Sequence, residues 1–288
     1  MPPIAWPSLG EVAETLLIPL YQRALEAQRP DALVKDDRAV ALVSQIDYDF
    51  SRLKLQPQDQ VGIILRLREF DRHARDFLAR NPRAVVVHIG CGLDTRFQRV
   101  DDGHVEWYDL DLPAVIELRR TLLGLGLDSE GPRYHLLACS VFDSDWLAPV
   151  SALGPRPILF LAEGVLCYFP GAQVKSLVLT LLDHFPGAEL VCDANTPLLA
   201  WLHNFELILS KMSARLRWGL RRSRDLEGWG QGIRLLDEWF YFDRPEPRLG
   251  ASRWMRYVPF LGKATGVFHY RLGTPPADAG LIHPAQHM

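Results

Sequence analysis

Between residues 84 and 194 of this 288-residue chain, short apolar runs alternate with segments of helical periodicity. The first, fourth and fifth runs are almost wholly apolar, as strands are when helices cover both faces of a parallel sheet. Helical patterns fall at 113–125 and 172–185. This alternation predicts an α/β fold with a doubly wound, mostly parallel sheet, in which the loops after the strands open on one edge. The expected strands are 84–89, 105–111, 134–140, 157–163 and 188–194.

The segments on either side of this alternation are less regular. Residues 9–80 have helical patterns, and Asn81-Pro82 predicts where the last of these helices ends. Downstream, residues 197–222 have a helical pattern, in which the basic run 215–224 is expected to form a solvated helix face. The remaining expected strands are 238–242 and 266–272.

Composition and charge argue against several classes of protein. A formal net charge of −3 gives no reason to expect nucleic acid or an anionic membrane as a partner. No apolar run approaches the roughly 20 residues of a membrane-spanning helix, and the N-terminus lacks the pattern of a secretory signal. The four cysteines form no Cys-x-x-Cys pair, and histidine completes no zinc pattern. We therefore expect a reduced, cytoplasmic protein with no metal site.

A glycine turn follows the first expected strand, in the stretch V-V-V-H-I-G-C-G-L-D-T-R (85–96). Glycines let the backbone approach a ligand closely, and the helix that follows aims N–H groups at it. The dinucleotide fingerprint G-x-G-x-x-G is incomplete, because Gly90 and Gly92 match but Thr95 occupies the third position. The missing glycine argues against a bound pyrophosphate, and a tight strand–helix turn without a ligand is the alternative.

Carboxylates end two of the expected strands. Asp111 lies 19 residues after Gly92, at the spacing where an acid binds ribose hydroxyls. Asp109 shares its strand face, but Asp111 is nearer the loop edge. Glu163 follows the fourth strand and is expected at the same edge, where it would meet a cationic or hydroxyl-bearing ligand. A solvated acid pair and a loop carboxylate are the structural alternatives.

These motifs carry a family resemblance over roughly residues 12–195. The strings H-I-G-C-G-L-D-T-R, D-L-D-L-P and L-A-E-G-V-L-C-Y resemble those of the S-adenosylmethionine-dependent methyltransferases related to leucine carboxyl methyltransferase, which include tetracenomycin-type polyketide O-methyltransferases. The resemblance implies a class I, Rossmann-like methyltransferase fold with S-adenosyl-L-methionine as cofactor. The implied segments are an N-terminal helical cap (1–82), a cofactor-binding α/β core (83–195), a C-terminal helical cap with the final strands (196–274) and a disordered tail (275–288).

The resemblance also implies roles for individual residues. Gly90, Cys91 and Gly92 would approach the amino-acid end of the cofactor through their backbone. Asp111 would bind the ribose, and Glu163 would lie against the cofactor.

The segment L-R-L-R-E-F-D (65–71) is similar to a family stretch in which an arginine pairs with the methionine carboxylate. Arg66 would take this role because the planar guanidinium binds a carboxylate through two nitrogens, and Arg68 is the weaker candidate. An exposed helix charge is the alternative for Arg66.

The chain departs from the family after the third strand, where Ser140 stands in place of the usual acid near the adenine. Ser140 and Val141 would then face the adenine through a hydroxyl or the backbone, or Asp143 would reach it.

The implied activity is S-adenosylmethionine-dependent O-methylation of a carboxylate or hydroxyl on a small molecule, with polyketide-like secondary metabolites among the candidates. The sulfonium supplies an electrophilic methyl, so the protein contributes positioning and exclusion of water. A carboxylate acceptor needs no base at pH 7, whereas a hydroxyl would. The catalytic residues are unassigned; Tyr168, Tyr21 and Arg23 are candidates for positioning the acceptor, and His88 is expected to be structural.

Two other functions remain as alternatives. A nicotinamide-dependent oxidoreductase shares the sheet and the ribose acid, but the missing third glycine argues against it. A non-catalytic S-adenosylmethionine-binding homologue is supported by Ser140 alone. The Trp-rich segments after residue 196 could line a pocket for a flat hydrophobic acceptor, although such aromatics more often form core. We expect a small metabolite rather than a protein C-terminus as acceptor, and the sequence does not indicate an oligomeric state.

Overall fold

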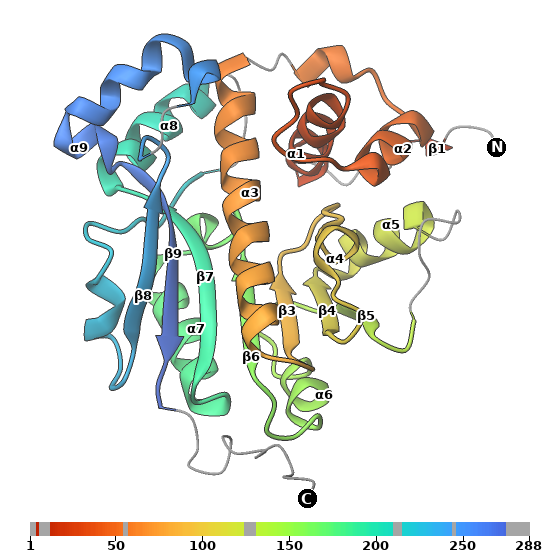
Figure 1. Ribbon diagram of the computed structural model, residues 1–288, viewed down its shortest axis with the longest axis vertical. Coiled ribbons are helices and arrows are strands. Elements are labelled where there is room, and N and C mark those ends of the chain that lie inside the picture. Colours follow the sequence, from red (N-terminus) through yellow and green to blue (C-terminus); the bar gives the residue numbers. More distant parts are fainter. Residues whose placement is uncertain are drawn as a thin grey trace, which may run out of the picture.

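The computed structural model describes residues 4–5, 12–53, 57–123, 131–209, 215–243 and 246–274. Its centre is a seven-stranded sheet with the order β5-β4-β3-β6-β7-β9-β8 (Figure 1). Neighbouring strands from β5 to β7 are parallel, and β9 is antiparallel to both β7 and β8. The predicted doubly wound, mostly parallel sheet is therefore confirmed. The strands are β3 (Val85–Ile89), β4 (Glu106–Asp111), β5 (Tyr134–Ala138), β6 (Ile158–Ala162), β7 (Ala188–Asn195), β8 (Arg234–Phe240) and β9 (Thr265–Leu272).

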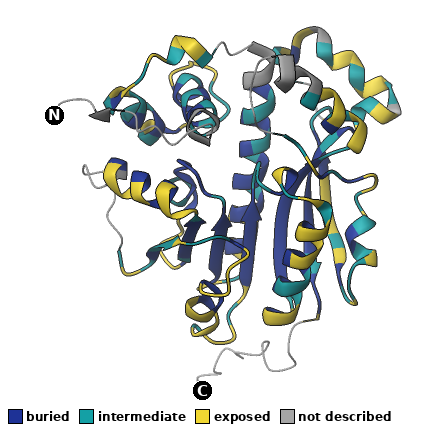
Figure 2. Ribbon diagram, turned by 180° about the vertical axis from the view of Figure 1, so that it is seen from behind, coloured by how far each residue is buried: buried dark blue, intermediate teal, exposed yellow. Residues whose placement is uncertain are grey.

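Helices cover both faces of this sheet and bury its apolar strands (Figures 1 and 2). On one face, Phe70 and Phe77 of the long helix α3 pack with Val86 of β3. On the other face, Val85 and Val87 pack with α6 and α7. Because successive strand residues point to opposite faces, a strand buried on both sides must be apolar throughout. The bounds of these helices are α3 (Pro57–Arg80), α6 (Leu147–Ser151) and α7 (Gly171–His184). α3 ends at the residue before Asn81-Pro82, as predicted.

A helical cap covers the carboxyl ends of β3 and β4 (Figure 1). It contains α1 (Val12–Ala27), α2 (Asp37–Gln45), η1 (Phe50–Leu53) and the short parallel pair β1 (Ile4–Ala5) and β2 (Ile46–Asp47). Its apolar side chains form a third core together with Leu93 of the glycine turn and Leu118 of α5 (Pro113–Leu123). This contact fixes the cap over the turn, and α4 (Arg96–Val100) leads from the turn toward β4.

The C-terminal segment corrects one expectation. The helix predicted over 197–222 ends early, because α8 spans Pro197–Leu209 and residues 215–220 are not helical. The side chain of Asn204 instead exchanges hydrogen bonds of 2.7 and 2.8 Å with the backbone of Leu216. The N–H groups of Arg217 and Trp218 donate to the carbonyl of Cys167, in the 3-10 turn η2 (Leu166–Tyr168). The basic run is therefore not a helix face, and its segment crosses beside the loop after β6.

The remaining elements are η3 (Asp225–Gly228), η4 (Pro247–Tyr257) and α9 (Pro259–Gly262). β8 begins at Arg234, earlier than the apolar pattern predicted, because it pairs with β9 over that length. The expected tail at 275–288 lies outside the described residues. Within the described ranges, no helix has both the length and the apolar composition needed to cross a bilayer.

Candidate active site

The glycine turn requires glycine at both predicted positions. Gly90 has a φ of +63°, and a Cβ there would lie 2.2 Å from Cγ2 of Val165. Gly92 has a φ of +50°, and a Cβ there would lie 3.1 Å from Cδ2 of Leu16 in the cap. Side chains at these positions would strain the backbone and push away the loop after β6 or the cap. Cys91, between the two glycines, is buried, and this burial raises the pKa of its thiol well above the usual value.

Two carboxylates two residues apart on β4 have different environments. Asp109 is buried and accepts hydrogen bonds from Arg119, Tyr134 and Trp107. Burial opposes its ionisation, but Arg119, His88 and Tyr134 together outweigh burial and lower the pKa of Asp109. Asp111 lies at the strand end, where Oδ2 accepts from the N–H of Gly92 at 2.8 Å and Oδ1 from that of Leu112 at 2.7 Å.

Burial raises the pKa of Asp111 and outweighs those two backbone hydrogen bonds. Each of its oxygens keeps a lone pair for a further donor. Of the two acids, Asp111 is therefore the one that can still receive ligand hydroxyls.

The structure brings Arg66 and Glu163 together, and it adds a third residue. Nε of Arg66 donates to Oε1 of Glu163 at 3.0 Å, and Nη1 donates to Oδ2 of Asp193 at 3.0 Å. Asp193 lies near the carboxyl end of β7 and also accepts from the N–H of Gly164 at 2.7 Å. Burial raises the pKa of Asp193, and the facing charge of Arg66 does not cancel the effect. Together, Arg66, Asp111, Glu163 and Asp193 form the sheet-edge site.

Gly164 explains how the guanidinium of Arg66 fits against the loop after β6. Gly164 has a φ of +66°, and a Cβ there would lie 3.3 Å from Nη2 of Arg66. Nη2 is also the terminal nitrogen that bonds to neither Glu163 nor Asp193 in the described contacts. The turn therefore lets the guanidinium lie against the backbone of the loop after β6, where the buried hydroxyl of Tyr241 is a further hydrogen-bonding partner of Arg66.

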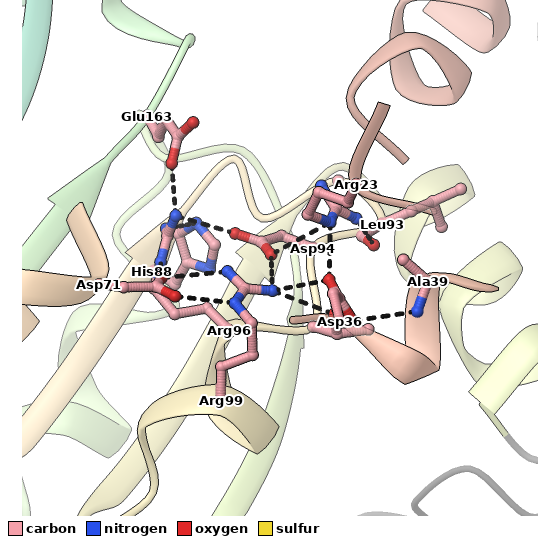
Figure 3. Close-up of polar contacts among 12 residues, drawn as sticks. Arg23, Asp36, Ala39, Asp71, His88, Leu93, Asp94, Arg96, Arg99 and Glu163 are labelled. Atoms are coloured by element: carbon pink, nitrogen blue, oxygen red, sulfur yellow. Dashed lines mark hydrogen bonds and ion pairs between the residues drawn. The ribbon is translucent and has the colours of Figure 1, made fainter. Parts of the chain in front are cut away.

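The D-T-R part of the glycine-turn motif builds a buried arginine network (Figure 3). Arg96 is 0% exposed, and its guanidinium contacts Asp71 at 2.8 Å and Asp94 at 3.1 Å. Its Nη2 also donates to Oε2 of Glu163, so this network and the sheet-edge site share one carboxylate. Burial opposes ionisation of Asp71 and Asp94, but the facing arginines, including Arg99, lower the pKa of both.

The same network reaches into the cap. Arg99 contacts Asp71, Asp94 and Asp36 at 2.8 to 3.0 Å. Asp36 also caps α2 by accepting from the N–H of Ala39 at 2.9 Å. The buried arginine network, defined as Arg23, Asp36, Asp71, Asp94, Arg96 and Arg99, therefore joins the cap, α3 and the turn.

Arg23 belongs to this network and not to an acceptor site. It is buried, donates to Oδ2 of Asp36 at 3.0 Å and donates to the carbonyl of Leu93 at 2.6 Å. The sequence placed it among the acceptor contacts, but its guanidinium holds the cap to the turn. His88 is also buried, between Arg96 and Asp109, in the structural position expected for it.

The residues expected near an adenine lie after β5. The Oδ2 of Asp143 accepts from the N–H of Ser140 at 2.9 Å, so Asp143 closes a local turn. Val141 is buried beside it. Sequence reasoning missed two apolar neighbours: Leu112 after β4 is 49% exposed, and Phe142 after β5 is 42% exposed. Two exposed apolar side chains at the ends of adjacent strands can sandwich a flat ring.

The acceptor candidates differ in their surroundings. Tyr168 is 40% exposed in η2, and desolvation of its hydroxyl raises its pKa to about 12. Tyr21 stacks on Phe50 at 4.6 Å between ring centroids, within the cap. The tryptophans of the C-terminal segment differ in exposure: Trp218 and Trp239 are buried, whereas Trp201 and Trp254 are exposed.

Asp193 of the sheet-edge site and Asp36 of the buried arginine network were not predicted, although the sequence contains a signal for each. Asp193 follows the apolar run L-V-C near the end of its predicted strand, a signal similar to the one that identified Asp111. Asp36 precedes an amphipathic helix, as an N-cap residue does. Arg68 points elsewhere: it lines a cavity with the cap loop and does not share the surroundings of Arg66.

The chemistry of the sheet-edge site fits a zwitterionic amino-acid group. Arg66 can receive a carboxylate, while Asp193 and Glu163 can receive an ammonium. Asp111 can accept from a diol at the end of β4, on the other side of β3. No group of three or more His, Cys, Asp and Glu side chains in the described parts of the chain is arranged to hold a metal ion.

Comparisons with known proteins identify the same family. The family model for leucine carboxyl methyltransferase matches residues 17–181. The tetracenomycin polyketide synthesis O-methyltransferase TcmP of Streptomyces glaucescens is 35% identical over 271 residues, covering 91% of this chain and 97% of that protein. The S-adenosyl-L-methionine-dependent methyltransferase dpfgK of Gibberella zeae is 31% identical, covering 86% of this chain and 88% of that protein.

A solved structure has the same fold. The magnesium protoporphyrin IX methyltransferase ChlM of Synechocystis PCC 6803, with bound SAH, superimposes with a TM-score of 0.50 at 13% identity. The match covers 82% of this chain and 92% of that one. At this identity the likeness concerns the fold alone, and it confirms the class I methyltransferase architecture.

Proposed function

Because this chain belongs to the leucine carboxyl methyltransferase family and is an S-adenosylmethionine-dependent methyltransferase, we propose that it methylates an oxygen atom of a small organic acid. One observation carries the proposal. Arg66, Glu163 and Asp193 converge near the carboxyl ends of β6 and β7. The glycine turn beside them has no room for a larger side chain at its two glycines.

The chain's own residues would hold the amino-acid end of the cofactor. Arg66 would bind the methionine carboxylate at Nη2, the nitrogen that faces Gly164. Asp193 and Glu163 would face the ammonium. The backbone of Gly90, Cys91 and Gly92 would approach the same end of the molecule.

The other half of the cofactor would lie along β4 and β5. Asp111 would accept from the ribose hydroxyls, since among the described residues its oxygens accept from backbone N–H groups alone. Leu112 and Phe142 would flank the adenine, with Ser140 and Val141 at its edge. In this position the hydroxyl of Ser140 compensates for the missing acid.

When bound, the sulfonium supplies an electrophilic methyl group, so the protein has to present an acceptor oxygen in line with it. Tyr168, on η2 in the loop after β6, would take this task. With a pKa of about 12 it stays protonated at pH 7, so it would donate a hydrogen bond to the acceptor and would not remove a proton.

The His–acid pairs that the structure describes do not supply a base at this edge. His88 and Asp109 are buried beneath the glycine turn, and His269 with Glu189 is buried between β7 and β9. His135 pairs with Glu106 at the amino ends of β5 and β4, and His73 on α3 faces Asp237 on β8. A carboxylate is already ionised at pH 7 and needs no base, so these observations favour a carboxylic acid over a phenol.

The surroundings favour an apolar acceptor. Exposed Trp201 on α8 and exposed Trp254 on η4 lie on the C-terminal elements near the cap side of the sheet (Figure 1). A relative is named for polyketide synthesis, which supports an aromatic polyketide-like acid as acceptor. We expect a free metabolite and not a protein C-terminus.

The family membership removes the oxidoreductase alternative. We further propose a cytoplasmic location, which is supported by four cysteines that are all free thiols.

The test has two stages. Titration calorimetry with S-adenosylmethionine and S-adenosylhomocysteine should show one site per chain, and absence of binding would refute the proposal. Turnover with methyl-labelled cofactor should then be screened on matched pairs of aromatic carboxylic acids and phenols. Mass spectrometry and alkaline lability would identify a methyl ester. Tight cofactor binding without turnover across the panel would instead indicate a non-catalytic homologue, and methylation of a phosphatase C-terminus would overturn the small-acid assignment.

A further inference from the structure

A second cavity lies away from the sheet-edge site, between the cap loop and the outer side of α3. Its volume is about 480 Å³, which is within the range of small-molecule sites. The walls come from three segments: residues 33–38 before and at the start of α2, one side of α3, and the end of α4. Arg68 lines it, two residues from Arg66 on a different side of the same helix.

The lining is strongly cationic. Five basic and three acidic side chains line the cavity, a net of two positive charges. Two of the acids, Asp36 and Asp71, are already paired with Arg99 in the buried arginine network. The third acid is Asp37, at the first position of α2.

Three of the cationic side chains that line the cavity have no carboxylate within hydrogen-bonding distance in the described contacts. Nζ of Lys35 donates to two backbone carbonyls, at 3.0 and 3.1 Å. Arg68 lies 3.8 Å from Glu69, and Arg75 lies 3.8 Å from Asp71, both beyond hydrogen-bonding distance. Arg75 otherwise donates to the carbonyl of Arg99 at 3.0 Å. These charges are therefore available to a multivalent anion.

Gln98 gives an independent indication of a ligand. It lines the same cavity, and both polar atoms of its amide are buried with no hydrogen-bond partner among the described residues. An orphaned buried amide costs about 1–3 kcal/mol per unsatisfied group, so native proteins rarely keep one without a purpose. An anion with protonated and unprotonated oxygens would satisfy the donor and the acceptor together once the buried amide of Gln98 turns toward the cavity.

We propose that this cavity is a second ligand site, for a small diphosphate-bearing anion held by Lys35, Arg68 and Arg75 over Gln98. The floor of the cavity is the buried arginine network, so the bound anion would tie the cap loop to α3 and α4. The site is separate from the sheet-edge site, and its occupation would stabilise the closed cap. The inference does not depend on the identity of the methyl acceptor.

The test uses the purified full chain and two probes at constant ionic strength, inorganic pyrophosphate and ADP. Calorimetry should show saturable one-to-one binding, and the anion should raise the midpoint of thermal unfolding. Tighter binding of ADP would identify a nucleotide as the ligand, and equal binding would identify the diphosphate itself. The Arg68→Ala/Arg75→Ala variant should bind both probes at least tenfold more weakly, and Gln98→Leu should weaken binding several-fold.

The matched control is Arg80→Ala. Arg80 lies on the same helix with a side chain 51% exposed, against 53% for Arg75, but outside the cavity. It should change the affinity less than twofold, and thermal unfolding would show whether each variant is folded. Saturating S-adenosylhomocysteine should leave anion binding in place. Absence of saturable binding, equal affinity in the double variant, or competition with S-adenosylhomocysteine would each overturn the proposal.

Discussion

The buried arginine network and the sheet-edge site use the same residue types with opposite electrostatic results. In the network, the pKa values of Asp71 and Asp94 are lowered, because facing guanidinium groups outweigh burial. In the site, the pKa values of Asp111 and Asp193 are raised, because burial outweighs their partners. Glu163 links the two regions, since Arg96 binds one of its oxygens and Arg66 the other.

The difference separates stability from ligand binding. Carboxylates whose charge is fully compensated stabilise the folded chain, and a ligand has little to add to them. Carboxylates whose charge is under-compensated cost stability, and a cationic or hydroxyl-bearing ligand would recover part of that cost. The G-L-D-T-R motif therefore serves both regions: Gly92 holds Asp111 in the sheet-edge site, and Asp94 and Arg96 belong to the buried arginine network.

The largest expected effect is the loss of the network's central residue. Arg96→Ala would remove a fully buried positive charge that Asp71, Asp94 and Glu163 all contact. Breaking a buried ion pair by removing one partner costs about 3–5 kcal/mol, so the free energy of unfolding should fall by that amount. Urea denaturation at pH 7 measures it. A loss below about 1 kcal/mol would contradict the central role of Arg96.

A matched pair of carboxylate variants tests the opposite signs directly. At pH 7, Asp71→Asn should lower the free energy of unfolding by about 2–3 kcal/mol, because it removes hydrogen-bonded charge from two arginines. Asp193→Asn should leave stability unchanged or slightly higher, because its ionised form is disfavoured in the folded state.

The pH dependence has opposite directions at the two residues. The stability that Asp71 contributes is present above its ordinary pKa of 3.8 and is lost as the pH falls through its lower folded value. The cost at Asp193 accumulates as the pH rises from the ordinary 3.8 to its raised folded pKa, and it is constant above that value. Urea denaturation should therefore show the Asp71→Asn deficit shrinking below about pH 4. If both variants lost equal stability at pH 7, the two regions would not differ as described.

Substitutions in the sheet-edge site, and not those elsewhere on α3, should weaken the affinity for the cofactor. Arg66→Lys keeps the positive charge but loses the planar fork, and S-adenosylhomocysteine should bind about tenfold more weakly. Arg66→Ala should weaken it about 10–100-fold, since charge-assisted hydrogen bonds contribute about 1.5–3 kcal/mol. Arg68→Ala, two residues along α3, should change the dissociation constant less than twofold. Equal losses at both arginines would mean that the sheet-edge site is not where the cofactor binds.

The sequence predicts the parts of the molecule that rest on local pattern. The five parallel strands could be placed because they alternate with helical patterns and three of them are nearly continuous apolar runs, and the turn because two glycines follow the first strand. Strand ends also identified Asp111 and Glu163, since an acid after a buried run has to meet water or a ligand.

The roles of the arginines could not be predicted in the same way. The partners of Arg66 lie 97 and 127 residues away, and no local pattern distinguishes it from Arg23, whose partner Asp36 is on the cap. Which partners surround each guanidinium depends on how the cap, α3 and two strand ends meet. For the same reason, the helix expected over 215–222 is wrong, because tertiary hydrogen bonds to Cys167 and Asn204 replace those of the helix.

The smallest expected effect, that of Gly164→Ala, distinguishes the cost of a strained backbone from a change in the geometry of the sheet-edge site. Gly164→Ala places a Cβ 3.3 Å from Nη2 of Arg66, on a backbone with a φ of +66°. The left-handed conformation alone should cost about 1 kcal/mol of stability. The displaced guanidinium should in addition weaken S-adenosylhomocysteine binding a few-fold.

Gly154→Ala provides the matched control for this effect. Gly154 has a φ of +75°, and a Cβ there would have no neighbour within 4 Å. Both variants should lose similar stability in urea denaturation, because both pay for the same left-handed backbone, but only Gly164→Ala should lose affinity. If the two variants bound S-adenosylhomocysteine equally well, the edge of Arg66 that faces Gly164 would not be the edge that the ligand uses. The affinity ratio between these two alanines therefore measures how closely the loop after β6 holds Arg66 in its binding position.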